Sequence, residues 1–167
     1  IAVAEPGTTV TFNNVLTNLG TVAEVFNITL GTSTFPAGTP MRLYGADGTT
    51  PLADTNGDGL ADAGVLAPGQ SVRIVLKAVL PATLVPGEYS VQKVAQAARS
   101  SASRATANDV VASVGTRCRI ELTPDNQAQG AYGRHVTYAH YLENRGNCEE
   151  AVRVVVGFIA DSLPGWA

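Results

Sequence analysis

An internal repeat is the feature that most constrains how this chain can fold. Residues 7–30 align without gaps with residues 133–156, at a constant spacing of 126 positions. Background composition would give about one or two identities over such a length. The observed identities are Gly7/Gly133, Val10/Val136, Thr11/Thr137, Leu16/Leu142, Asn18/Asn144, Gly20/Gly146 and Glu24/Glu150. The chain therefore contains the same structural unit at least in part twice.

Each copy of the repeat alternates apolar and polar residues with a period of two. In the first copy, the alternating apolar residues of 10–16 would lie on one face of a strand. Residues 26–30, which follow Asn18-Leu19-Gly20, show the same pattern. A period of two is typical of β-strands, and Asn and Gly suit the tight turn between them. We predict two antiparallel strands joined by a short loop in both copies.

Further strands are predicted between the two copies. The pattern favours strands at 41–44, 71–80, 88–98 and 109–114, an irregular loop over 51–64 and a mobile polar loop over 99–108. The Ala- and Ser-rich tract at 95–107 would also suit a helix, but the regular spacing of strands around it favours a strand pair. Turn signals every 8 to 12 residues, about the spacing of β-sandwich proteins, indicate an all-β sandwich.

The repeat also predicts two modules. In the second copy a strand-like segment, residues 117–123, precedes the shared pair, and its counterpart in the first copy would lie before Ile1. We therefore expect residues 1–115 to form one module whose first strand is missing. Residues 116–167 are expected to form the N-terminal part of a second, homologous module, completed by the same chain or by another.

Composition excludes several classes of protein. The chain has 167 residues, of which 45% are hydrophobic and 15% charged, and its net charge is −3. It thus has no basic surface for nucleic acid. No apolar run reaches the roughly 18 to 20 residues that a transmembrane helix needs, and residues 1–7 do not resemble a signal peptide.

Residues 54–62, with the sequence DTNGDGLAD, form the clearest candidate site. Calcium prefers oxygen ligands, and such loops supply them from alternate positions while a glycine allows the bend. The predicted ligands are Asp54, Asn56, Asp58, the Leu60 carbonyl and Asp62, with Gly59 at the bend and Asp47 or water completing the shell. A calcium-sensor loop would carry Glu where Val65 stands. The alternative is an Asx- and Gly-rich turn with solvated carboxylates.

Cys118 and Cys148 are predicted to form a disulfide. Cys118 begins the first strand of the second copy, and Cys148 follows the end of the next strand. If these strands pair antiparallel, the two thiols come within bridging range. A disulfide would indicate an oxidising compartment, whereas the alternative is two buried free thiols.

Other residues with binding potential give weaker signals. His135 and His140 would point to opposite faces of one strand and cannot chelate a metal together. Asn27-Ile28-Thr29 matches a glycosylation sequon by spelling only. Trp166 is expected to be a core aromatic, with a sugar-stacking role as the alternative.

The order of the short motifs resembles a known repeat family. These motifs are residues 6–12 (PGTTVTF), 17–20 (TNLG), 66–70 (LAPGQ) and 86–89 (PGEY). They resemble the immunoglobulin-like repeat found in tandem on bacterial and archaeal surface and S-layer-associated proteins, which is related to the module appended to some alpha-galactosidases. The resemblance implies a sandwich of about seven strands that serves as a spacer, stalk or assembly module outside the cell.

The sequence thus predicts a non-enzymatic structural module of an exported bacterial surface protein, stiffened by calcium and a disulfide. It would lie at the cell envelope surface, with neighbouring modules of the same or other surface-protein chains as partners and envelope polysaccharide as a further partner. The alternative is an adhesin or carbohydrate-binding accessory module, which would require Tyr132, Tyr138, Tyr141 and Trp166 to converge. An enzyme would require a grouped nucleophile, base and orienting residue, and the sequence offers no such set.

Overall fold

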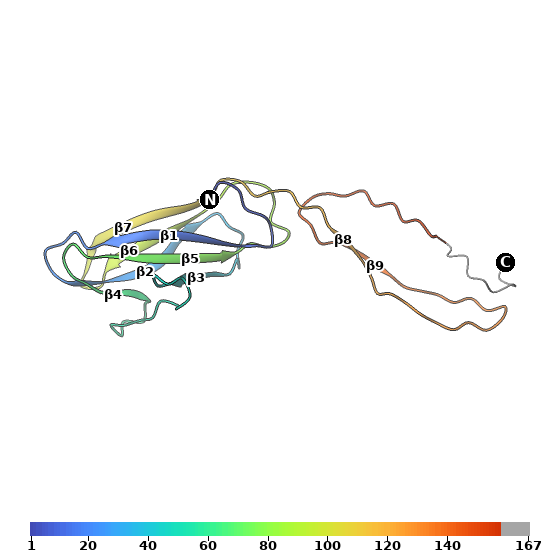
Figure 1. Cartoon of the computed structure of the whole chain (residues 1–167), viewed down its shortest axis with the longest axis horizontal. Helices are drawn as coiled ribbons and strands as arrows, with labels where there is room; N and C mark the ends of the chain where they lie inside the picture. The colour runs from blue at the N-terminus through green and yellow to red at the C-terminus, as the bar shows by residue number, and fades with distance from the viewer. Residues whose placement is uncertain (158–167) are drawn as a thin grey trace.

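A computed structural model of the chain describes residues 1–157, and their regular structure consists of β-strands (Figure 1). Most of these strands follow the predicted alternation of apolar and polar residues. In chain order they are β1 (Thr9–Thr17), β2 (Glu24–Ser33), β3 (Met41–Tyr44), β4 (Asp62–Leu66), β5 (Ser71–Val79), β6 (Tyr89–Ala97), β7 (Ser100–Val111), β8 (Ile120–Thr123) and β9 (Tyr141–Asn144).

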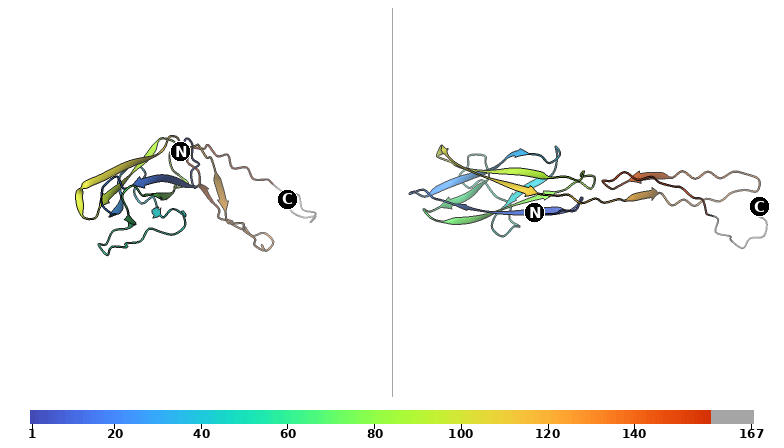
Figure 2. Two further views of the ribbon diagram at one scale, coloured as in Figure 1. Left: turned by 60° about the vertical axis from the view of Figure 1, so that its left-hand side comes forward. Right: turned by 90° about the horizontal axis from the view of Figure 1, so that it is seen from above.

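The first seven strands form a sandwich of two sheets. One sheet has the order β1-β5-β3 and the other the order β4-β2-β6-β7, and the paired strands run antiparallel. Figure 2 shows the two layers from two further directions. A parallel bridge between Ala4 and Val114 ties the start of the chain to the segment that follows β7. The predicted all-β sandwich is confirmed.

Apolar side chains from both sheets fill the space between the layers. Phe12 and Leu76 meet Val91 and Val111 in one cluster, and Phe26 packs with its neighbours in a second cluster. Leu76 is fully buried. Burial of such side chains stabilises each by roughly 1.5 to 3 kcal/mol. The alternation seen in the sequence is therefore the pattern of strands with one face turned to this core.

β1 and β2 do not pair with each other, contrary to the prediction. β1 pairs with β5 in one sheet, whereas β2 pairs with β4 and β6 in the other. The turn after β1 therefore crosses between the layers. The crossing lets both apolar faces share one core, whereas a hairpin within one sheet would need a separate layer to cover them.

The segment expected as a mobile polar loop is strand instead. Residues 99–108 belong almost entirely to β7, which pairs with β6 from Tyr89/Val111 to Gln96/Arg104. β7 lies at the edge of its sheet, and most of its first half is exposed. Exposed edge strands favour polar residues, which is why this strand has little apolar signal. The predicted loop at 51–64 likewise ends earlier, because β4 begins at Asp62.

The last described part of the chain is a hairpin that extends away from the sandwich (Figure 1). Ile120–Thr123 pairs antiparallel with Tyr141–Asn144. The pair predicted within the second copy is therefore wrong, because β9 pairs with the segment before the repeat and residues 150–156 form no strand. The Asn147 side chain joins the hairpin to the sandwich by donating to the carbonyls of Leu84 and Gly115, at 2.7 and 2.8 Å. No helix in the described residues is long and apolar enough to cross a membrane.

Candidate functional site

The loop before β4 is organised around Asp54. Asp54 Oδ1 accepts a hydrogen bond from the Gly57 amide, and its Oδ2 accepts one from the Gly59 amide, both at 2.7 Å. The two glycines have φ angles of 78° and 89°, in the left-handed region that favours glycine. The loop is therefore tight because the Asp54 carboxylate accepts hydrogen bonds from two backbone amides. Glycine at these two positions allows the φ angles that bring the amides to it.

Asp58 joins the loop to the neighbouring strand β2. Its Oδ2 accepts a hydrogen bond of 2.6 Å from Asn27 Nδ2, and its Oδ1 accepts one of 3.0 Å from the Leu60 amide. Asn56 Nδ2 also donates to Asp58 Oδ2, at 3.1 Å. These donors, with Asn27 first, lower the pKa of the Asp58 carboxyl below its usual value. Asp58 is therefore a charged ligand candidate at neutral pH.

Asp62 closes the loop from the inside. It is buried, and its oxygens accept hydrogen bonds from the Thr55 amide, the Thr55 hydroxyl and the Gly64 amide at 2.6 to 2.7 Å. Burial raises the pKa of this carboxyl, but the hydrogen bonds from Thr55 and Gly64 outweigh that effect, so the net pKa is lowered. Both carboxylate oxygens of Asp62 are therefore occupied by hydrogen bonds from Thr55 and Gly64.

The structure does not bring the three loop carboxylates together at ligand spacing. Within residues 1–157, three potential metal ligands lie close together only at Cys118, Cys148 and Glu150. The two cysteines of this group form a disulfide. Asp47 lies in its own turn, where bonds from the Thr50 hydroxyl and the Thr49 and Thr50 amides lower the pKa of its carboxyl. Its carboxylate is therefore engaged by hydrogen bonds within that turn.

Asn27 is the site residue that the sequence reasoning missed. It lies on β2 opposite Asp62, is 7% exposed and donates to Asp58. Its Oδ1 is buried without a hydrogen-bond partner. The Nδ2 group of Asn27 faces Asp58, and its unpaired Oδ1 is an oxygen of the kind that calcium binds. Its burial in the sheet also makes Asn27 a poor glycosylation acceptor. One sign of this role is present in the sequence, because the alternation in β2 predicts that Asn27 lies on the face opposite Phe26 and Ile28.

The two cysteines form the predicted disulfide, and their Cα atoms lie 5.3 Å apart. The bond joins the segment before β8 to the segment after β9. In the same turn, Asn144 Nδ2 donates to the Cys148 carbonyl at 2.7 Å, and Asn144 Oδ1 accepts from the Gly146 amide. The hairpin is thus closed by a covalent bond and an asparagine turn together.

The first copy contains the same asparagine turn. Asn18 Nδ2 donates to the Val22 carbonyl at 2.9 Å, and Asn18 Oδ1 accepts from the Gly20 amide at 2.9 Å. Val22 lies at the repeat position of Cys148. The two copies therefore share these two hydrogen bonds of the turn as well as its identical residues.

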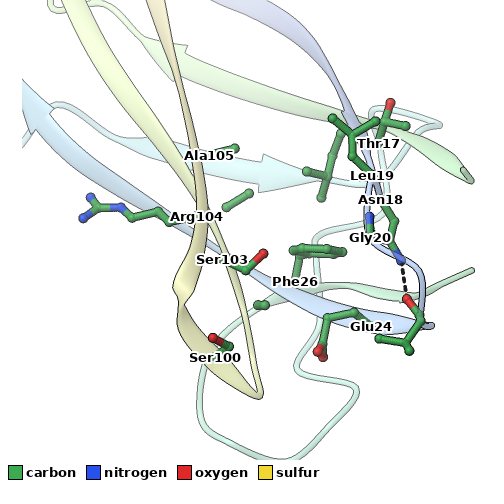
Figure 3. A pocket seen from close by; sticks show the side chains of 14 residues that line it. Thr17, Asn18, Leu19, Gly20, Glu24, Phe26, Ser100, Ser103, Arg104 and Ala105 are labelled. Atoms are coloured by element: carbon green, nitrogen blue, oxygen red, sulfur yellow. Dashed lines mark hydrogen bonds between the residues drawn. The ribbon is translucent and has the colours of Figure 1, made fainter. Parts of the chain in front are cut away.

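An open hollow lies beside the Asn18 turn, between the ends of β1, β2 and β7 (Figure 3). Small and apolar side chains line most of it, and its charged lining residues are Glu24 and Arg104. The Arg104 side chain points away from the other labelled residues in Figure 3. The lining gives this hollow no grouped acid, base and nucleophile.

The remaining predicted residues lie in the second copy. His135 and His140 are exposed between β8 and β9, as are Tyr132 and Tyr138, and Tyr141 is exposed at the start of β9. Trp166 lies outside the described residues.

Comparison with known proteins gives no family for this chain. No family model matches it, and no curated protein matches it.

Proposed function

We propose that the chain is a structural module of an exported bacterial surface protein, acting as a stalk, spacer or S-layer assembly unit. The observation that carries this proposal is the repeated Asn18 and Asn144 turn, with identical hydrogen bonds, in two units placed end to end (Figure 1). Tandem units joined end to end extend a chain over a distance. The disulfide supports an oxidising location outside the cell.

Three features support an immunoglobulin-like identity for the sandwich. The order β1-β5-β3 corresponds to strands B-E-D of that fold, and β2-β6-β7 corresponds to C-F-G. The Tyr89 hydroxyl, at the start of β6, donates to the Val85 carbonyl at 2.8 Å. A tyrosine at the start of strand F that bonds back to the preceding corner is a hallmark of immunoglobulin-like domains.

The second unit supports neighbouring modules as partners. Val136 and Tyr138 are exposed, whereas their repeat counterparts Val10 and Phe12 are buried beneath the opposite sheet of the sandwich. Strands equivalent to those of the first module would cover this face. The same comparison accounts for the exposed Tyr138 without a carbohydrate ligand, and it favours the structural role over the adhesin alternative.

Calcium would stiffen the first module at the loop before β4. On binding, Asp54, Asn56 and Asp58 would converge on the ion, and the Asn27 amide of β2 would turn its free oxygen toward it in place of the missing acidic position. The ion would then link the loop to a central part of the sandwich, because Asn27 belongs to a strand that pairs on both sides. Asp62 would support the loop from beneath.

Calcium is expected to raise the unfolding temperature of the full chain, and excess chelator is expected to reverse the rise. A ligand at about 100 times its Kd stabilises the folded state by about 2.7 kcal/mol. Asp58→Ala is expected to abolish the shift, and Asp125→Ala, at an exposed position in the second unit, is the matched control that keeps it. Calorimetry and thermal unfolding provide the measurement. An unfolding temperature indifferent to calcium would overturn the calcium site.

A further inference from the structure

An ion pair is buried inside the sandwich, away from the loop before β4. Lys93 of β6 and Asp109 of β7 form an ion pair, with 2.8 Å between Nζ and Oδ2. Both side chains are only 6% exposed. Removal of two charges from water is costly unless hydrogen bonds satisfy them.

Asn14 of β1, in the opposite sheet, faces the same interior space. It has the same inward orientation as Phe12 and Leu16, two residues to either side. Phe12 lines a hollow with Asp109, and Leu16 lines a second hollow with Lys93. Asn14 therefore lies between the points where β1 meets the two members of the ion pair.

All three side chains have a buried polar atom without a hydrogen bond. These atoms are Asn14 Oδ1, Lys93 Nζ and Asp109 Oδ2, and the two charged atoms contact each other only as an ion pair. The surroundings are apolar, because Val91 and Val111 belong to one core cluster and Ile28 and Ile74 to the other. Buried unsatisfied groups are rare in folded proteins, so three on facing strands of one sandwich require an explanation.

We propose that Lys93 and Asn14 form an intramolecular amide cross-link, with Asp109 moving the protons. Asp109 first takes a proton from the Lys93 ammonium. The neutral Nζ then attacks Cγ of Asn14, and a new Nζ–Cγ bond forms. Asp109 returns the proton to the Asn14 amide nitrogen, the Cγ–Nδ2 bond breaks, and ammonia leaves. Asp109 finally takes the remaining extra proton from Nζ and ends as a neutral acid.

The product resolves each of the unsatisfied atoms. The former Asn14 carbonyl can accept a hydrogen bond from protonated Asp109, and the new amide N–H can donate to the other Asp109 oxygen. The two buried charges disappear, which removes their desolvation cost. The bond also joins β1 to β6, and these strands belong to different sheets. The cross-link thus ties the two layers of the sandwich covalently.

Direct bonding of Lys93 to Asp109 is the competing reaction. It would release water instead of ammonia, and it would link two strands that already pair throughout their length. It would also leave no carboxyl to move the protons and no use for Asn14. The observations therefore favour Asn14 as the residue that gives up its amide nitrogen.

The intact mass of the full chain tests the cross-link. Beyond the two hydrogens lost to the disulfide, we expect the mass to fall short of the sequence mass by one molecule of ammonia. Proteolysis should then yield a branched peptide that joins the Asn14 and Lys93 segments and resists reduction. The full sequence mass would overturn the proposal, and so would the loss of one water mapped to Lys93 and Asp109.

Variants assign the roles of the three residues. Asn14→Ala and Lys93→Met should each show the full mass calculated from the variant's sequence, apart from the two hydrogens of the disulfide. Lys77→Met on β5 is the matched control, which should still lack one ammonia. Most Asp109→Asn molecules should show no ammonia deficit, and a β-sheet signal in circular dichroism should show that this variant is folded. A full deficit in folded Asp109→Asn would overturn the proton-transfer role. The wild-type mass decides the cross-link itself even if a variant does not fold.

Discussion

Replacement of Asn18 by alanine is expected to destabilise the sandwich by roughly 2 to 4 kcal/mol, because it leaves the buried Leu66 carbonyl unpaired and removes two partly buried hydrogen bonds. Asn18 is 2% exposed. Its Nδ2 donates to the carbonyls of Val22 and Leu66 at 2.9 and 2.8 Å, and its Oδ1 accepts from the Gly20 amide. The side chain thus holds the crossing between the two sheets. Urea unfolding of the full chain, followed by the fluorescence or circular dichroism of the sandwich, measures the loss.

Asn144→Ala is the matched control for this experiment. Asn144 makes the corresponding bonds to Cys148 and Gly146, but it is exposed. Water can satisfy the groups that the substitution frees, so we expect a loss below about 1 kcal/mol. Equal losses at the two positions would contradict the central role assigned to the buried turn in the first module.

Removal of the disulfide is the second change with a large expected effect. The β8–β9 hairpin has few buried apolar side chains to hold it, and an isolated two-stranded hairpin is at best marginally stable. Closure of a loop of this length stabilises the folded state by roughly 3 to 4 kcal/mol. In a Cys118→Ser/Cys148→Ser variant, we expect hydrogen exchange protection to vanish from β8 and β9 while β1 to β7 keep theirs.

Glu150→Gln is the control for the disulfide variant. Glu150 contacts Cys148 Sγ at 3.8 Å, so the substitution changes a charge beside the disulfide but leaves the bond intact. It should keep the protection of the hairpin. Persistence of protection in the double serine variant would show that strand pairing alone holds this unit.

Much of the fold could be predicted from local pattern. The period of two in segments such as 71–79 identifies strands with one buried face, and the repeat predicts the same tight turn at Asn18 and at Asn144. The pairing of β1 with β5 was not predictable, because alternation marks which face of a strand is buried but not which strand lies beside it. β7 was missed because an edge strand exposed on one side need not carry apolar residues.

The candidate sites were predictable to different degrees. Cys118 and Cys148 followed from the expected strand ends, and the loop at 54–62 followed from its spacing of Asp, Asn and Gly. Asn27 and the Lys93–Asp109 pair were not predictable, because each acts with residues distant in the chain. Lys93 stands among Val91 and Ala95 on an inward face, and only the sheet register shows that Asp109 lies beside it.

Mechanical unfolding of the full chain, pulled from its two ends, tests the structural role most directly. The proposal predicts that residues 1–115 unfold in one step, and that the force of this step is higher in calcium than in chelator, because the ion links the loop before β4 to β2. Asp58→Ala should show the lower force in both conditions. Equal unfolding forces for the wild type in calcium and in chelator would contradict a module stiffened by calcium.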